Sequence, residues 1–297
     1  MIYEEISANK YKTVFLVVFF VIIVLLLGYF FGKLSGFGPL GFLLALIISF
    51  IMAWGSYYYS DQIVLSVSHA VPADPVDHMY LINTVEGVCL AAGLPRPKVY
   101  VIYDTAPNAF ATGRDPAHAA VVFTTGIIEK LNRQELEGVI AHEISHIKNY
   151  DILISTISVV LVGTITLLSD WMLRNVRWSK LGGRGRGAGG YVGLAILIVS
   201  ILLAILSPLI AQLMHLAISR RREFQADASA ALFTRYPPGL ASALEKIAQD
   251  TEPLEVANKA TAHLFIANPF KNIKGVTAGL FDTHPPIEER IKKLRAM

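Results

Sequence analysis

Four long apolar runs limit what this chain can fold into. Each is long enough to cross a bilayer, which takes about 20 predominantly apolar residues. Only 16% of the residues are charged, whereas a soluble domain has about 25%. The sequence therefore predicts a mainly α membrane protein with about four transmembrane helices. The four runs are residues 14–31, 39–59, 152–173 and 191–217.

The first two runs are predicted to form an N-terminal transmembrane hairpin, residues 1–60. Lys10 and Lys12 precede the first run, as basic residues do in a signal peptide. That run is longer than a usual signal core, however, and no cleavage site of small residues follows it. We therefore expect an uncleaved span. The second run ends in Trp54 and three tyrosines, residues 57–59, which are typical of a membrane–water interface.

The last two runs are predicted to form a second hairpin, residues 152–216, around a loop rich in glycine and arginine. The run 152–173 is more polar than the first two, so this pair can also be a shallow hairpin that does not fully cross. The loop is short and its Gly-Arg part has no stacking aromatics, so a solvated connector is a better interpretation than an RNA-binding patch. The small net charge of +3 likewise favours no nucleic-acid partner.

The remaining segments, residues 61–151 and 217–297, are predicted to form the two halves of one α+β domain outside the membrane. Residues 98–103 and 119–124 are short β runs, predicted to pair as a small antiparallel sheet. The edge of such a sheet can bind an extended peptide through main-chain hydrogen bonds, or the strands can simply cover the neighbouring helix. Both interpretations stay open.

The strongest chemical signal is a pair of histidines, His142 and His146, with Glu143 between them. Asn132 and Glu135 predict a capped helix start, and an apolar face continues through the motif. Residues four apart on a helix share a face, so both histidines can bind one metal ion. Glu143 lies beside them and can reach a water on that metal. The spacing is typical of a zinc hydrolase, although it also occurs by chance.

A second pair, Glu223 and Asp227, supplies what the histidines lack. A catalytic zinc has three protein ligands and an open fourth position. Glu223 is the predicted third ligand, and Asp227 is predicted to accept a hydrogen bond from a ligand histidine. His146 lies six residues before the third run and Glu223 six residues after the fourth. Two crossings would therefore return both to the same side, roughly 10 Å above the membrane.

Together these motifs resemble those of the HtpX-type membrane zinc metalloproteases, relatives of the CAAX-prenyl endopeptidases. The resemblance is carried by residues 108–113, 142–146 and 223–227, in the expected order, and extends over essentially the whole chain. It implies that residues 61–151 and 217–297 form a zincin-like catalytic domain with one Zn²⁺ per subunit. The implied zinc ligands are His142, His146 and Glu223, with Glu143 as the general base.

The resemblance also implies roles for residues elsewhere in the chain. His284 would approach the active site and help to hold the oxyanion. Its place before Pro285 is equally that of a residue at a helix start, so both interpretations stay open. Arg290, on the same predicted helix, is a candidate for orienting a carboxylate. The segment implied to lie beside the substrate is Asn108, Ala109, Phe110 and Ala111.

The implied function is hydrolysis of peptide bonds in damaged or misfolded membrane proteins, a form of protein quality control. The partners would then be membrane-protein or unfolded-protein substrates and the lipid bilayer. The resemblance implies a multi-pass protein of the cell's inner membrane with its catalytic domain in the cytoplasm. The sequence itself does not decide this orientation, because basic residues are almost balanced between the two sides.

Two other functions stay open. A CAAX-type prenyl-protein peptidase would have more spans, enclosing a chamber. A non-enzymatic membrane scaffold could use zinc structurally, but a closed structural site usually has four protein ligands, often cysteines. The one cysteine, Cys89, lies on the apolar side of a predicted helix, which favours a core residue over a nucleophile. The motifs therefore favour an open, catalytic zinc site.

Overall fold

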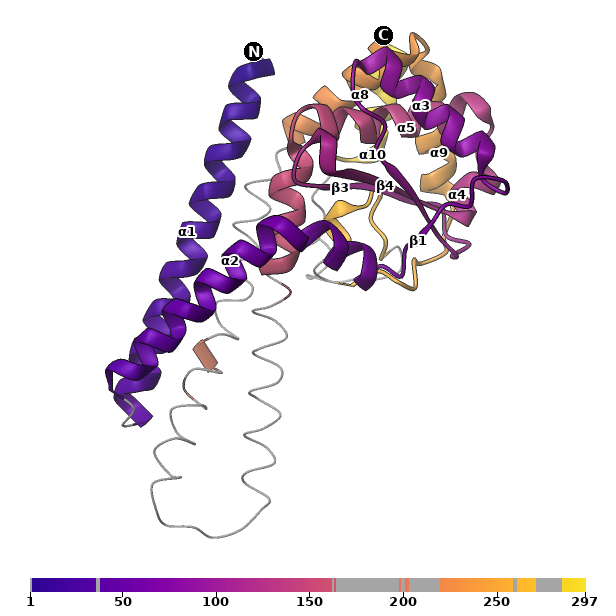
Figure 1. Cartoon of the computed structure of the whole chain (residues 1–297). Coiled ribbons are helices and arrows are strands. Elements are labelled where there is room, and N and C mark those ends of the chain that lie inside the picture. The colour runs from indigo at the N-terminus through magenta and orange to yellow at the C-terminus, as the bar shows by residue number, and fades with distance from the viewer. Residues whose placement is uncertain are drawn as a thin grey trace.

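The chain forms a long helical hairpin attached to an α+β domain (Figure 1). The computed structural model describes residues 2–35, 38–161, 163, 198, 201–202, 220–258, 261–270 and 285–297. Most of the third and fourth apolar runs lies outside these described residues, as does His284. The second transmembrane hairpin therefore stays a prediction.

Helices α1 (Ile2–Ser35) and α2 (Pro39–Val67) form the first hairpin. Both are long and apolar enough to cross a membrane, over Ile6–Phe30 and Pro39–Val67. Many of their apolar side chains are exposed, as in helices that contact lipid. Glycines let the two backbones approach closely, because a Cβ on Gly41 would overlap the backbone of Gly32.

The sheet beside the hairpin is mixed. Its strands are β1 (Val71–Pro72), β2 (Lys98–Ile102), β3 (Ala109–Gly113) and β4 (Ala119–Thr124). They lie in the order β1-β2-β4-β3, with β2 parallel and β3 antiparallel to β4. The predicted antiparallel pairing of residues 98–103 with 119–124 is therefore wrong. The reason is that the segment between them forms a strand, β3, which takes the antiparallel place beside β4.

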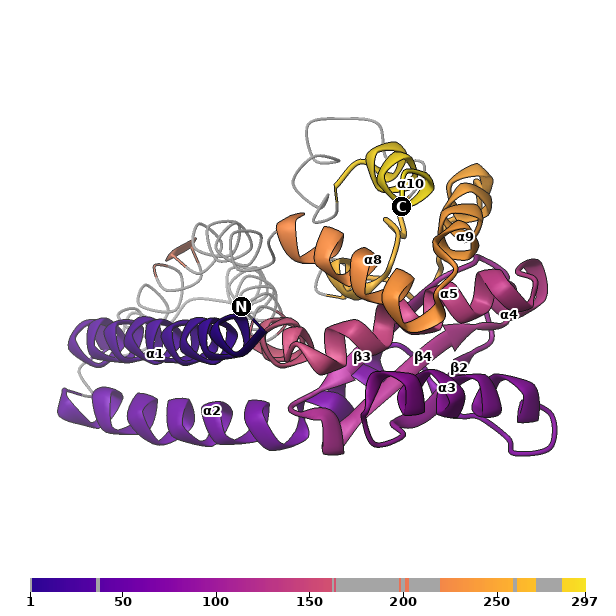
Figure 2. The ribbon, with the colours of Figure 1, turned by 90° about the horizontal axis from the view of Figure 1, so that it is seen from above.

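Helices pack around α5 (Arg133–Lys148), the helix that carries both histidines. Figure 2 shows α5 between α3 (Met79–Ala92) on one side and α8 (Arg220–Thr234) and α9 (Pro237–Gln249) on the other. One buried core cluster joins α3, the sheet, α5 and α9, so the segments before and after the second predicted hairpin share a core. The shorter elements are η1 (Pro116–His118), α4 (Thr125–Lys130), η2 (Ala262–Leu264) and α10 (Ile287–Arg295).

A further helix, Asp151–Leu161, connects this domain to the hairpin. It follows α5 after a turn at Tyr150, which has a left-handed φ of +58°. Leu153 and Ile157 of this helix pack in a second apolar cluster with Phe20 of α1. The start of the third apolar run thus follows α5 directly and packs against α1.

Cys89 is a core residue, as predicted. Its side chain lies on the inner face of α3 and is 2% exposed. Burial raises the pKa of its thiol to about 11. A thiol with so high a pKa carries almost no thiolate at neutral pH, so it is a poor nucleophile.

Candidate metal centre

Helix α5 begins with a capping box, as predicted. The Asn132 side chain accepts hydrogen bonds from the backbone N–H groups of Gln134 and Glu135, both 3.0 Å long. The Glu135 side chain accepts one from the Asn132 N–H at 2.8 Å. Lys246 of α9 donates to the same Glu135 carboxylate at 2.7 Å. These contacts fix where α5 begins and therefore where its histidines lie.

The structure brings His142, His146 and Glu223 together. The Nε2 atoms of the two histidines lie 3.1 Å apart. Each Nε2 lies 3.6 Å from an oxygen of the Glu223 carboxylate. One donor atom from each residue lies within 4.8 Å of the others, so the group could hold a metal ion. His142 and Glu223 are buried, and His146 is partly buried.

Each histidine uses its second ring nitrogen to contact a carboxylate. His142 Nδ1 lies 3.0 Å from Asp227 Oδ1, the contact predicted for Asp227. His146 Nδ1 lies 3.0 Å from Asp151 Oδ2. A carboxylate on the second nitrogen fixes the tautomer and the ring orientation of a ligand histidine. Both Nε2 atoms are thereby directed toward the same point.

Asp151 is a site residue that the sequence analysis missed. Besides His146, its carboxylate accepts hydrogen bonds from Asn9 Nδ2 of α1 and from Arg222 Nη1 of α8, both 2.8 Å long. The only signal in the sequence was an acidic residue directly before the third apolar run. Its role depends on the turn at Tyr150, which the residue pattern does not reveal.

Arg290 orients a carboxylate, as predicted. Its Nε and Nη2 donate to the two oxygens of Asp227 at 2.9 and 2.7 Å, a bidentate pair. The guanidinium also donates to the Ile266 carbonyl at 3.3 Å and lies 3.8 Å from Glu223. Arg290 is 1% exposed. A buried arginine of this kind is stable only with such complete pairing.

The charges around His142 favour its protonated form. Burial and the charge of Arg290 lower its pKa, but the hydrogen bonds to Asp227 and Glu223 and the charge of Asp227 outweigh both and raise it to about 9. Burial raises the pKa of Asp227, whereas Arg290 and His142 together hold it at about 2. A metal ion at this site would therefore have to displace a proton from His142.

Glu143 borders a small cavity at the metal centre. The cavity has a volume of about 30 Å³, room for about one water molecule. His146, Glu223 and Ala111 of β3 also line it. Glu143 itself is 2% exposed. Glu143, a carboxylate that is not among the three predicted ligands, thus lines the same cavity as two of them.

His263 is a second residue that the sequence analysis missed. It lies in η2 and lines the same cavity. Its Nε2 lies 3.3 Å from the carbonyl oxygen of Ser155, on the helix after α5. Nothing in the local sequence pattern around residue 263 pointed to this place.

Main-chain groups of β3 alternate between β4 and the open edge of the sheet. The Asn108 carbonyl accepts a hydrogen bond of 3.0 Å from the Thr124 N–H, so position 108 faces β4. Alternation in an antiparallel pair then turns the main-chain groups of Ala109, Ala111 and Gly113 away from β4. The edge strand therefore presents these three positions outward.

Two of the outward positions already have partners. The Ile266 N–H donates to the Ala109 carbonyl at 3.0 Å, and the Gly113 N–H donates to Thr156 Oγ1 at 3.2 Å. Ala111 lies between them, beside the metal cavity. Within the described part of the chain its outward N–H and C=O have no hydrogen-bond partner. They can therefore pair with an extended peptide.

Asn108 and Phe110 face away from the cavity. Asn108 Nδ2 donates to the Ala267 carbonyl at 3.1 Å. The Phe110 ring is buried against Phe265, with ring centroids 5.1 Å apart. Both side chains hold residues 261–270 against β3. Any substrate contact by Asn108 and Phe110 stays a prediction, as does the role of His284.

The donor set fits a zinc ion. Imidazole nitrogen and carboxylate oxygen are usual zinc ligands, and three protein ligands leave a fourth position open. The carboxylates behind both imidazoles are also typical of zinc sites. The residues present are thus those that a hydrolytic zinc site needs.

Comparison with known proteins places the chain among peptidases. The model of the family described as Peptidase family M48 matches residues 75–297. A protein named Protease HtpX homolog from Caldanaerobacter subterraneus subsp. tengcongensis is 46% identical over 296 residues, covering 100% of this chain and 98% of its own. Another of that name from Dictyoglomus turgidum is 48% identical over 297 residues, covering 99% of this chain and 94% of its own.

A solved structure shares the fold. The crystal structure of S. mikatae Ste24p matches with a TM-score of 0.50 and 18% sequence identity. The match covers 98% of this chain and 67% of that one. At this level of sequence identity, the match shows a similar fold and nothing about activity.

Proposed function

This chain belongs to peptidase family M48, and on that premise we propose that it is a membrane-bound, zinc-dependent endopeptidase. His142, His146 and Glu223 would hold the zinc, and Glu143 would be the general base. One observation carries the proposal: Glu143, two residues of the donor cluster (His146 and Glu223) and Ala111 of the edge strand β3 line a single cavity.

In the proposed reaction, the groups of the chain position the peptide and move the protons. When bound, zinc supplies a Lewis acid that polarises the scissile carbonyl and acidifies water. Glu143 accepts the proton of the attacking water and delivers it to the leaving amine. Ala111 holds the peptide extended, while Asp227 and Asp151 keep the two imidazoles oriented. We further propose that His284 helps to hold the oxyanion.

The proposed location is the cell's inner membrane, with several spans and the catalytic domain in the cytoplasm. Two candidate spans and the direct connection of α2 to the domain support a membrane location. The proposed substrates are damaged or misfolded membrane proteins. The proximity of the metal centre to the Asp151–Leu161 helix, which packs on α1, supports substrates close to the bilayer.

The experiment is cleavage of casein by the full chain, purified in detergent. It compares the zinc-loaded parent, the chelator-treated parent, Glu143→Gln and Glu137→Gln. Glu137 is a matched control, because it lies on the same helix and lines neither the metal cavity nor the donor cluster. We expect Glu143→Gln to keep its zinc and lose roughly a hundredfold to ten-thousandfold in rate. Glu137→Gln should cleave like the parent.

Two outcomes would contradict the proposal. Undiminished cleavage by Glu143→Gln would show that Glu143 is not the general base. No cleavage by a folded, zinc-loaded parent would favour a peptidase of narrow specificity, such as a prenyl-protein peptidase, or a structural zinc.

A further inference from the structure

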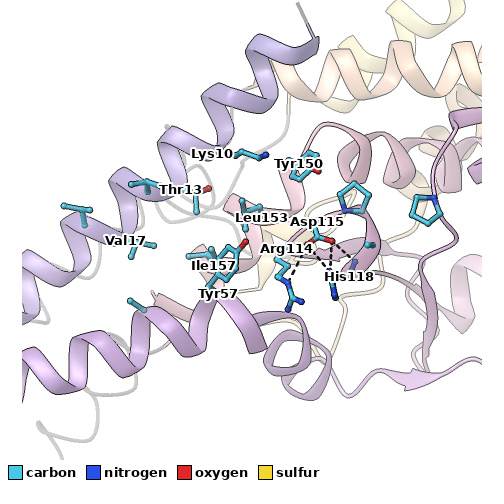
Figure 3. A pocket seen from close by; sticks show the side chains of 16 residues that line it. Lys10, Thr13, Val17, Tyr57, Arg114, Asp115, His118, Tyr150, Leu153 and Ile157 are labelled. Carbon is cyan, nitrogen blue, oxygen red and sulfur yellow. Dashed lines mark hydrogen bonds and ion pairs between the residues drawn. The ribbon is translucent and has the colours of Figure 1, made fainter.

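A second cavity, of about 850 Å³, lies between α1, α2 and the catalytic domain. Figure 3 shows the side chains that line it, with Lys10 and Tyr150 at one side and Arg114, Asp115 and His118 at another. Its apolar walls come from both candidate spans and from the Asp151–Leu161 helix. The apolar lining includes Val14, Val17, Val18, Ala53, Leu153 and Ile157.

One helix separates this cavity from the metal centre. Leu153 and Ile157 line the large cavity, whereas Ile152 and Ser155 line the small one. These pairs lie on different faces of the Asp151–Leu161 helix, since residues three or four apart share a face. The large cavity is therefore not a continuation of the small cavity at the metal centre, and its lining favours a different ligand.

The polar end of the cavity carries a positive charge. Lys10 Nζ lies 4.7 Å from the centroid of the Tyr150 ring. Arg114 lies nearby, with its Nε 3.6 Å from the Asp115 carboxylate. That carboxylate is already held by His118, through its backbone N–H at 2.9 Å and its ring nitrogen at 2.8 Å. The lining of this end thus contains two basic side chains, Lys10 and Arg114, and one carboxylate, Asp115, which leaves a net positive charge.

Aromatic residues of α2 place the polar end at the level of lipid headgroups. Trp54 and Tyr58 are in contact, with ring centroids 5.1 Å apart, and Tyr57 lines the cavity itself. Tryptophan and tyrosine gather where a membrane meets water. The apolar walls then extend from this level along the candidate spans, toward the hydrocarbon.

We propose that this cavity binds an anionic glycerophospholipid from the surrounding bilayer. The phosphate headgroup lies between Lys10 and Arg114, and an acyl chain lies along the apolar walls at Val17, Ala53 and Ile157. Charge complementarity selects an anionic lipid, because a zwitterionic headgroup would bring a second positive charge beside the two cations. The bound lipid fills the space between the hairpin and the catalytic domain.

The test counts lipids bound to the detergent-purified full chain by native mass spectrometry. Dioleoylphosphatidylglycerol and dioleoylphosphatidylcholine are titrated separately into the parent and into Lys10→Gln/Arg114→Gln. We expect the parent to prefer the anionic lipid. Each removed cation should weaken that binding about fivefold, and both together about thirtyfold.

Two further variants sharpen the result. Lys33→Gln is the matched control, because Lys33 lies in the last turn of the same helix, far from the cavity. It should bind the anionic lipid like the parent. Ala53→Trp fills the apolar part and keeps both cations, so it should also lose the lipid. Thermal unfolding of each variant checks that it is folded.

Three results would overturn the proposal. The first is equal binding of the two lipids by the parent, and the second is equal loss in Lys33→Gln and the double variant. The third is displacement of the lipid by glycerol phosphate at equal concentration, which would show a site for a free anion instead of a lipid.

Discussion

Asn9 donates a hydrogen bond of 2.8 Å to the Asp151 carboxylate, across 142 positions of sequence. The same carboxylate contacts His146 Nδ1, and Arg222 donates to both Asn9 and Asp151. The first helix of the membrane hairpin is thereby connected to the candidate metal centre through two consecutive contacts. The orientation of His146 should therefore depend on a residue near the start of the chain.

Replacing Asn9 by alanine tests this dependence. We expect Asn9→Ala to bind zinc up to about tenfold more weakly, because loss of a group that orients a ligand's carboxylate lowers metal affinity. Competition with a chromophoric chelator measures the change. Thr13→Ala is the control, since Thr13 is buried one turn further along α1 and its hydroxyl donates to the Asn9 carbonyl, not to Asp151. Equal zinc affinities of Asn9→Ala and Thr13→Ala would show that the contact of Asn9 with Asp151 does not influence the metal centre.

Arg290 and Asp227 should depend on each other for stability. Asp227→Ala leaves a guanidinium that is 1% exposed without its bidentate partner. Removing one partner of a buried pair typically costs about 3–5 kcal/mol. We therefore expect a smaller fall in Tm for Asp227→Ala/Arg290→Met than for Asp227→Ala. Thermal unfolding of the metal-free proteins, in chelator, measures this.

The exposed pair of Glu245 and Arg295 provides the comparison for that experiment. Arg295 Nη2 lies 2.8 Å from the Glu245 carboxylate at the surface. Exposed pairs contribute little to stability, so Glu245→Ala should change Tm only slightly. The buried pair would not be coupled if the fall in Tm of Asp227→Ala/Arg290→Met equalled the sum of the falls measured for Asp227→Ala and Arg290→Met separately.

Zinc binding should release a proton from His142 at neutral and mildly alkaline pH. The pKa of His142 in the metal-free protein is raised to about 9, so at pH 7.5 the imidazole is protonated and must lose its proton to bind a metal. An unperturbed histidine, with a pKa of about 6.5, would release almost none. The apparent affinity for zinc should therefore keep rising as the pH increases from about 6.5 to about 9.

Calorimetric titration in buffers of different ionisation enthalpy counts the protons released. About one proton from His142 is expected at pH 7.5. In Asp227→Asn the carboxylate charge that raises the pKa is gone, so the release should fall at this pH. A parent that releases no proton at pH 7.5 would contradict the raised pKa.

The sequence predicted the candidate metal centre better than the sheet. Helical spacing fixes that His142 and His146 share a face, and the capping box fixes where their helix begins. A zinc site with two histidines also needs a third protein ligand, and this requirement identified Glu223 although it lies far from His146 in the sequence. The sequence did not identify Asp151 as a site residue, because its contact with His146 depends on the left-handed backbone at Tyr150.

The strand pairing failed for a different reason. Small residues such as Ala109 and Ala111 have no strong β preference, so the pattern gave no clear strand between residues 98–103 and 119–124. Their strand is defined instead by pairing with β4 and by the partners Ile266 and Thr156 on its other side. Such long-range contacts are invisible in a local pattern.

The outward N–H of Ala111 should contribute to substrate binding. Ala111→Pro removes that N–H but no hydrogen bond to β4, and proline is tolerated on an edge strand where its nitrogen faces outward. We expect zinc content and Tm close to those of the parent. The value of kcat/KM for a peptide substrate should fall roughly tenfold, as expected for one lost hydrogen bond. Ala111→Gly is the control, because it keeps the N–H, and cleavage by Ala111→Pro at the rate of Ala111→Gly would show that the peptide does not pair with this edge.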